Sequence, residues 1–217
     1  MLFRSTSMSP KKNLNVATLI ILLSGLAAIS FIATSQSDPN DLINKGRLIF
    51  EETAGGVGCA ACHGHFGMGD LGIAPNNRGA DETRVRNALD SVEPMAFLKL
   101  NDDEIKAVAA FLVYLGTLQP FKTTRQDTKF DPVQIEVPLK TKVQFIIENK
   151  DGEDCTFTSK DSGITDKTLK SKKVDDVVWT TPDKEGTFKA TCTQQPGQEL
   201  TIVVKKKIGR ASCRERV

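Results

Sequence analysis

The feature that most constrains this chain is a five-residue motif in its first half. Cys59 and Cys62 are separated by two alanines, and His63 follows directly. Two thiols at this spacing lie on one helical turn and can reach the two vinyl groups of one porphyrin, while the histidine points at the iron. The motif therefore predicts one covalently attached haem c, held by two thioether bonds and ligated by His63. A redox dithiol and half of a zinc site stay open as rival interpretations, although zinc would need a second pair of ligands.

The N-terminal residues have the pattern of an export signal. Three basic residues precede an apolar run at 16–33, and small residues stand at −3 and −1 of a possible cleavage point after Ser35. The run is also just long enough to span a bilayer as a helix. We therefore expect residues 1–37 to be a signal peptide or a membrane anchor. The protein would act on the periplasmic side of the cytoplasmic membrane, anchored by residues 16–33 or soluble after cleavage.

The charge of the chain comes from its two ends. Residues 208–217 resemble the one-frame translation of a sequencing-library adaptor, so we expect them, with Cys213, to be foreign to the natural protein. The whole chain carries a net charge of +2, but both ends are positive and residues 36–207 alone carry about −3. The basic balance is therefore no sign of a nucleic-acid partner, and none is expected.

Apolar residues recur with helical spacing between residues 38 and 118, which predicts an all-α domain. The clearest helix covers 102–115. Asn101 is a good N-cap for it, and Glu104 three residues later completes the pattern of a capping box. A small residue, Gly46, would allow close approach of another helix to the first one.

The hydrophobic period changes to two in the second half of the chain. Residues 119–128 are polar and include a proline, so we expect a linker there. Residues 129–207 then alternate between apolar and polar side chains in many short segments separated by glycines. This pattern predicts an all-β sandwich as a second domain.

Residues 40–118 resemble a class I cytochrome c domain. The resemblance is carried by the haem motif with Gly64, by residues 72–75, by Met95 and by residues 100–115. It implies that the Pro75 carbonyl orients the His63 ring and that Met95 is the second ligand of the haem iron. It also implies that the first and last helices cross, with Gly46, Phe50 and Leu112 at the contact.

Three alternatives to Met95 remain on the distal side. Met68 lies only five residues after His63 and would have to round the haem edge on a very short chain. His65 is a second candidate, and an open distal position is the third. An open position would permit binding of small ligands or peroxide chemistry, whereas methionine ligation raises the reduction potential and suits electron transfer.

Residues 129–207 resemble a cupredoxin, which implies a Greek-key sandwich. The resemblance is carried by Phe130 and Pro132 and by residues 143–149, 155–157, 186–188, 192 and 200–204. A blue-copper cupredoxin has a histidine where Cys155 stands, a cysteine where Cys192 stands, a second histidine near Gln198 and usually a methionine near Leu200. Type 1 copper needs two imidazoles, and both histidines of the chain lie in the other domain. No copper is expected.

The two cysteines at these former ligand positions have three possible states. The resemblance places Cys155 and Cys192 on either side of one site, and an oxidising compartment favours a disulfide between them. A two-thiolate metal site assisted by Asp154 and two unpaired buried thiols are the alternatives.

The chain as a whole is expected to be multidomain and to carry electrons rather than to be an enzyme. The haem domain would be the carrier, and the sandwich would dock on a redox partner, such as a membrane-associated oxidoreductase. Two rival functions stay open. One is a haem enzyme with an open distal site, and the other is a binding module for iron or copper with the haem as a local reductant.

Overall fold

The computed structural model describes residues 38–194 and 197–206, whose helices and strands belong to one compact unit. The signal or anchor expected at 1–37 and the foreign tail expected at 208–217 lie outside these residues. Within the described part of the chain, no helix has the length and apolar composition that a membrane crossing requires.

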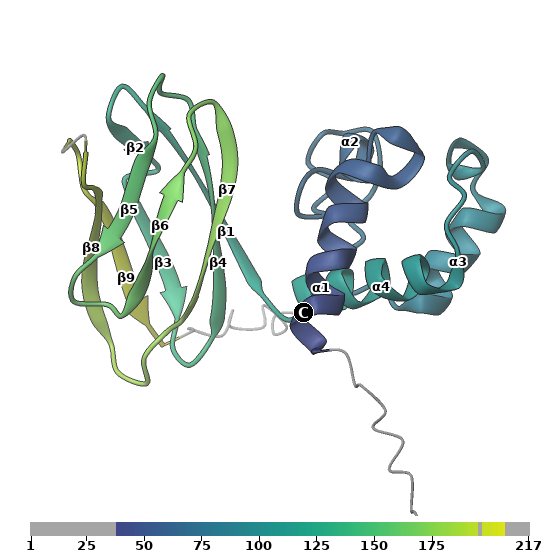
Figure 1. The fold of residues 1–217 in the computed structure, drawn as a ribbon. Helices are drawn as coiled ribbons and strands as arrows, with labels where there is room; N and C mark the ends of the chain where they lie inside the picture. The colour runs from purple at the N-terminus through teal and green to yellow at the C-terminus, as the bar shows by residue number, and fades with distance from the viewer. Residues whose placement is uncertain (1–37, 195–196, 207–217) are drawn as a thin grey trace, which may run out of the picture. The chain divides into compact units, whose positions relative to one another are not determined.

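The first half of the described chain is helical, as expected (Figure 1). It contains α1 (Pro39–Leu48), the π-helical turn η1 (Ile49–Thr53), the 3₁₀ turns η2 (Ala54–Gly56) and η3 (Glu93–Met95), α2 (Ala60–His63), α3 (Glu82–Ser91) and α4 (Asp102–Gly116). The capping box of α4 is confirmed, because the Asn101 side chain accepts from the Glu104 amide and the Glu104 side chain accepts from the Asn101 amide. Asp81 caps α3 in the same way by accepting from the Arg84 amide.

Helices α1 and α4 approach each other at Gly46. A Cβ atom added to this glycine would lie 1.9 Å from the carbonyl oxygen of Ala107, so only glycine fits there. The rings of Phe50 and Phe111 pack beside the crossing with centroids 5.6 Å apart. The close approach was therefore predictable, but Ala107 and Phe111 make the contact. Leu112 lies in the same core.

The second half forms two packed β-sheets (Figure 1). One sheet has the order β2-β1-β4-β7 and the other β3-β9-β8-β5-β6. The strands are β1 (Gln119–Gln126), β2 (Lys129–Asp131), β3 (Gln134–Pro138), β4 (Lys142–Asn149), β5 (Cys155–Ser159), β6 (Ile164–Leu169), β7 (Lys173–Thr180), β8 (Gly186–Cys192) and β9 (Leu200–Lys205). Each sheet contains one parallel pair, β1 with β4 and β3 with β9, among antiparallel ones.

The segment expected to be a linker, residues 119–128, is instead mostly strand β1. It pairs with β4 along one side and with β2 along the other, so it lies inside a sheet. Its polar composition was misleading because two of its polar side chains are buried, Thr123 and Arg125. Arg125 is fully buried and forms an ion pair with Asp151. Burial of a paired arginine leaves no apolar signal in the sequence.

Candidate functional site

The motif of Cys59, Cys62 and His63 lies on a single helical turn. Cys59 is the N-cap residue of α2, and Cys62 and His63 are its last two residues. Both cysteines are free thiols; Cys59 is partly buried and Cys62 is exposed. The turn ends at Gly64, whose positive φ of 78° would strain most other residues. The local fold therefore presents both thiols and the imidazole from one short, closed turn.

The His63 ring is held by one hydrogen bond. It is 9% exposed, and its Nδ1 lies 2.7 Å from the carbonyl oxygen of Pro75. Because a carbonyl can only accept, Nδ1 must donate, and the neutral ring then carries its free lone pair on Nε2. An imidazole fixed in this tautomer is prepared to ligate a metal through Nε2.

The motif opens onto a cavity of about 340 Å³. Most of its wall is apolar and comes from the helical core, including Phe50, Val85, Leu89, Leu100, Val108 and Leu112. Cys59, Cys62, His63, Pro75 and Met95 all line this cavity. Arg84 and Asn77 are polar members of the lining. An apolar cavity with a few convergent polar groups is the usual form of a cofactor site.

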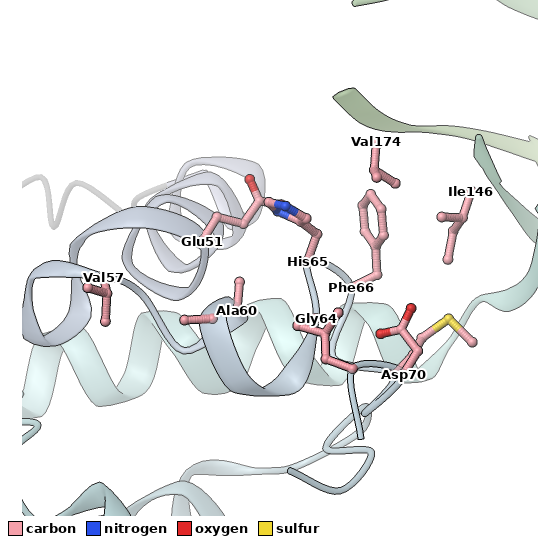
Figure 2. Close-up of a pocket in the computed structure, with 12 residues that line it drawn as sticks. Glu51, Val57, Ala60, Gly64, His65, Phe66, Asp70, Ile146 and Val174 are labelled. Carbon is pink, nitrogen blue, oxygen red and sulfur yellow. The ribbon is translucent and has the colours of Figure 1, made fainter. Parts of the chain in front are cut away.

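The other two candidates for a distal ligand line a different cavity. Met68 and His65 border a space of about 420 Å³ that neither cysteine of the motif reaches. In Figure 2 the carboxylate of Glu51 points toward the His65 ring there. Burial raises the pKa of Glu51, although nearby Arg47 opposes this shift. Among Met95, Met68 and His65, the structure thus brings only Met95 to the thiol-lined cavity.

The environment of Cys59 does not favour a redox dithiol. Burial raises the pKa of this thiol to about 11, whereas reactive dithiols have a lowered pKa. Across the described residues, no group of three or more His, Cys, Asp or Glu side chains is arranged to hold a metal ion.

The residues around the cavity fit a haem. The apolar wall suits the porphyrin face, the free thiols suit its vinyl groups, and Arg84 supplies a positive charge for its carboxylates. Sequence reasoning missed Arg84. Its side of α3 also carries Val85, Ala88 and Leu89, so the helical spacing of these residues was the available signal.

The sandwich contains a cysteine pair in a different state. Cys155 and Cys192 form a disulfide with Cα atoms 5.3 Å apart, and both are at most 2% exposed in the sandwich core. Asp154, the carboxylate considered for a metal site, accepts from the Lys170 ammonium and from the Ser171 amide instead. Leu200, near the position of a copper-binding methionine, is fully buried, while Gln198 is exposed.

The comparison with protein families decides the fold of this part. Residues 115–204 match a family described as a cupredoxin-like domain. The C-terminal part of the chain is a cupredoxin-like domain. The match begins before the expected boundary at 129 and takes in strand β1, in agreement with the sheet pairing. It covers less than half of the chain, and no curated protein matches the sequence.

Solved structures are similar to this domain at low identity. A copper-binding protein in its apo form is 18% identical with a TM-score of 0.36, over 41% of this chain and 89% of that one. The metal-binding domain of a Cu(I)-exporting P-type ATPase from Streptococcus pneumoniae is 12% identical with a TM-score of 0.37, over 42% and 88%. A purple cupredoxin from Nitrosopumilus maritimus is 14% identical with a TM-score of 0.32, over 39% and 98%.

Proposed function

We propose that this protein is an exported electron carrier with one covalently bound haem in its helical part and a copper-free cupredoxin-like domain. One observation carries the proposal: a single apolar cavity is lined by Cys59, Cys62, His63 and Met95. Bound there, a haem would supply one-electron redox chemistry. The chain's own residues would attach it, fix the His63 tautomer through Pro75 and exclude water with the apolar wall.

The remaining parts of the proposal concern partner and place. The segment before residue 38 would export the chain to the periplasmic side of the membrane, where disulfides form. The partner would be a redox protein such as a membrane-associated oxidoreductase. The cupredoxin-like domain would serve in docking rather than as a second redox centre, since it has no histidine to offer copper.

The test is to replace the two methionines separately in holoprotein matured in an exporting host. We expect one haem per chain that stays bound after denaturation. Met95→Ala should abolish the weak absorption band near the red end of the oxidised spectrum. It should also lower the reduction potential by roughly 0.1 V or more, within the range of about 0.8 V that axial ligands span.

Met68→Ala is the matched control and should leave band and potential unchanged, because Met68 lines the other cavity. A chain that retains no haem after denaturation would contradict the proposal. If the haem is retained but Met95→Ala changes nothing, the rival with an open distal site is favoured.

A further inference from the structure

The cupredoxin-like domain has a strand that is buried on both faces. Val143, Phe145 and Ile147 of β4 point into the sandwich core. Ile146, on the opposite face of β4, is 5% exposed and belongs to the core of the helical part. Figure 2 shows it beside Phe66, which follows the haem-binding turn. A sheet strand buried on both faces has a partner on each side, so this face of the sheet packs on the helical part.

One arginine, Arg78, makes several polar contacts at this boundary, where Arg47 and Lys122 also form ion pairs with Asp176 and Asp70. The half-buried Arg78 guanidinium donates four hydrogen bonds, with distances between 2.6 and 3.2 Å. The acceptors are the carbonyls of Phe66, Leu115 and Leu118 and the side-chain oxygen of Gln144 on β4. The carbonyls at the end of α4 lack helical partners, so a cation is well placed there. Arg78 thereby ties three separate segments together.

The contact continues through Gln144 to a buried charge. Gln144 is fully buried and donates from Nε2 to Asp176 of β7 at 2.7 Å. Asp176 also accepts from Arg47, which forms a second ion pair with Glu51. Both ends of the Gln144 amide are used, so its orientation is fixed by a cation on one side and an anion on the other. Within the described part of the chain, Gln144 is the one side chain that accepts a hydrogen bond from Arg78, so truncating it would remove that acceptor.

The position of Arg78 gives this boundary a connection to the haem site. The segment after His63 and the segment after Pro75 run past each other as the two arms of one loop. They are joined at one place by the His63–Pro75 hydrogen bond and at another by the bond between Phe66 and Arg78. The Asn77 amide also donates to the Gly67 carbonyl at 3.0 Å, so the Arg78 bond is one of the ties on the arm that holds the Pro75 carbonyl, and losing it loosens that arm.

We propose that Arg78 and Gln144 are positioning residues through which the cupredoxin-like domain holds the Pro75 carbonyl against His63. The domain is then a structural part of the haem site as well as a surface for partners. The hydrogen bond from Nδ1 raises the basicity of the ligating nitrogen, so a loosened bond weakens the donor and favours reduced iron. The consequence for the reduction potential rests on the proposed function, whereas the order of the loop does not.

Two variants test this without changing any charge, Gln144→Leu and Arg78→Lys. We measure hydrogen exchange at the amides of Asn77 and Gly69, which donate to carbonyls within the loop at 3.0 and 2.8 Å. Both variants should speed exchange at these amides about tenfold, the effect of one lost hydrogen bond. In the holoprotein both should also raise the reduction potential.

Lys142→Met is the matched control. Lys142 also lies on β4 and contacts the helical part, with its ammonium 5.0 Å from the centre of the Tyr114 ring. Among the described residues, no hydrogen bond or ion pair joins its side chain to the loop. It should leave exchange and potential unchanged. Equal exchange rates in the wild type and in either folded variant would overturn the proposal, as would an equal effect of Lys142→Met. If one variant fails to fold, the other decides the question.

The exchange experiment is run on the full chain with and without haem. If the wild type carries no covalent haem, the proposed function is wrong. The exchange rates of the variants would still test the positioning role, because they do not depend on haem. Haem retention with unchanged exchange would sink the positioning role alone.

Discussion

The two parts of this chain each contain one cysteine pair, and they use it in opposite ways. Cys59 and Cys62 are free, lie on one helical turn and face a cavity. Cys155 and Cys192 come from two strands, are buried and are bonded to each other. The pair within one turn is unbonded and so available to a cofactor, whereas the pair across neighbouring strands is bonded, with its Cα atoms 5.3 Å apart and inside the usual disulfide range.

The two pairs also differ in their surroundings. In the sandwich, the disulfide lies in a core of aromatic and aliphatic side chains, and neither of its cysteines lines any of the main cavities among the described residues. In the helical part, the glycine-rich loop after the motif and the apolar faces of α3 and α4 leave room.

The largest expected effect comes from removing the sandwich pair. Cys155→Ala with Cys192→Ala should lower the free energy of unfolding of the sandwich by about 3–4 kcal/mol, because the bridge closes a long loop. Trp179, the only tryptophan of the chain, packs against Phe145 in the sandwich and reports its unfolding in urea by fluorescence. Covalent haem should be unaffected, whereas Cys59→Ala with Cys62→Ala should abolish it. Loss of haem in the sandwich variant would break the comparison.

The next effect should appear in the helical part. Gly46→Ala places a methyl group against the Ala107 carbonyl and should destabilise the α1–α4 crossing by about 2–3 kcal/mol. Far-ultraviolet circular dichroism during denaturation measures it. Gly152→Ala is the control, since nothing lies within 4 Å of the added atom. A variant as stable as the wild type would show that the helices can separate freely.

A smaller effect is expected at the start of α4. Asn101→Ala removes the side-chain acceptor of the capping box and should cost about 1 kcal/mol of helical-part stability. Lys106→Ala, at an exposed position within the same helix, should change little. If Trp179 fluorescence and helical dichroism shift together in Asn101→Ala, the two parts unfold as one unit, which sharpens the comparison.

The smallest effect concerns acid. The Lys122 ammonium on β1 bonds Asp70 and, despite the opposing effect of burial, lowers the pKa of that carboxyl below its ordinary value of 3.8. A lowered folded pKa gives stability that is present above the unfolded pKa and lost as the pH falls through the folded one. Both groups are exposed, so we expect only a few tenths of a kcal/mol. Lys122→Met should remove this part of the acid dependence in a pH series of urea titrations, and an unchanged series would show that the pair contributes nothing.

Local signals predicted the helical part well. The capping box of α4 was predictable because Asn101 and Glu104 have the side chains and the spacing that cap a helix. The close approach at Gly46 was predictable because only glycine lacks a Cβ atom. The alternation of Val143, Phe145 and Ile147 likewise predicted β4.

The rest depended on partners far away in the chain. Strand β1 could not be recognised because its burial relies on an ion pair between Arg125 and Asp151 and on parallel pairing with β4. Strand β2 has only three residues and β6 is mostly polar, so alternation marks both of them weakly. The hydrogen bond from Arg78 to Gln144 joins residues 66 positions apart, so the hydrophobic pattern of neither segment can predict it.

The course of the chain from α4 into β1 limits how this protein could be recombined. Only two residues separate the end of the helix from the first strand, and that strand supplies hydrogen bonds to both of its neighbours. A cut at 128 would leave β2 and β4 with open edges and would carry a strand of the sandwich away on the helical fragment. A gene fusion that exchanges either half intact must therefore join at residues 117–118. A two-residue connection is too short to accommodate a change in the length or direction of the chain there.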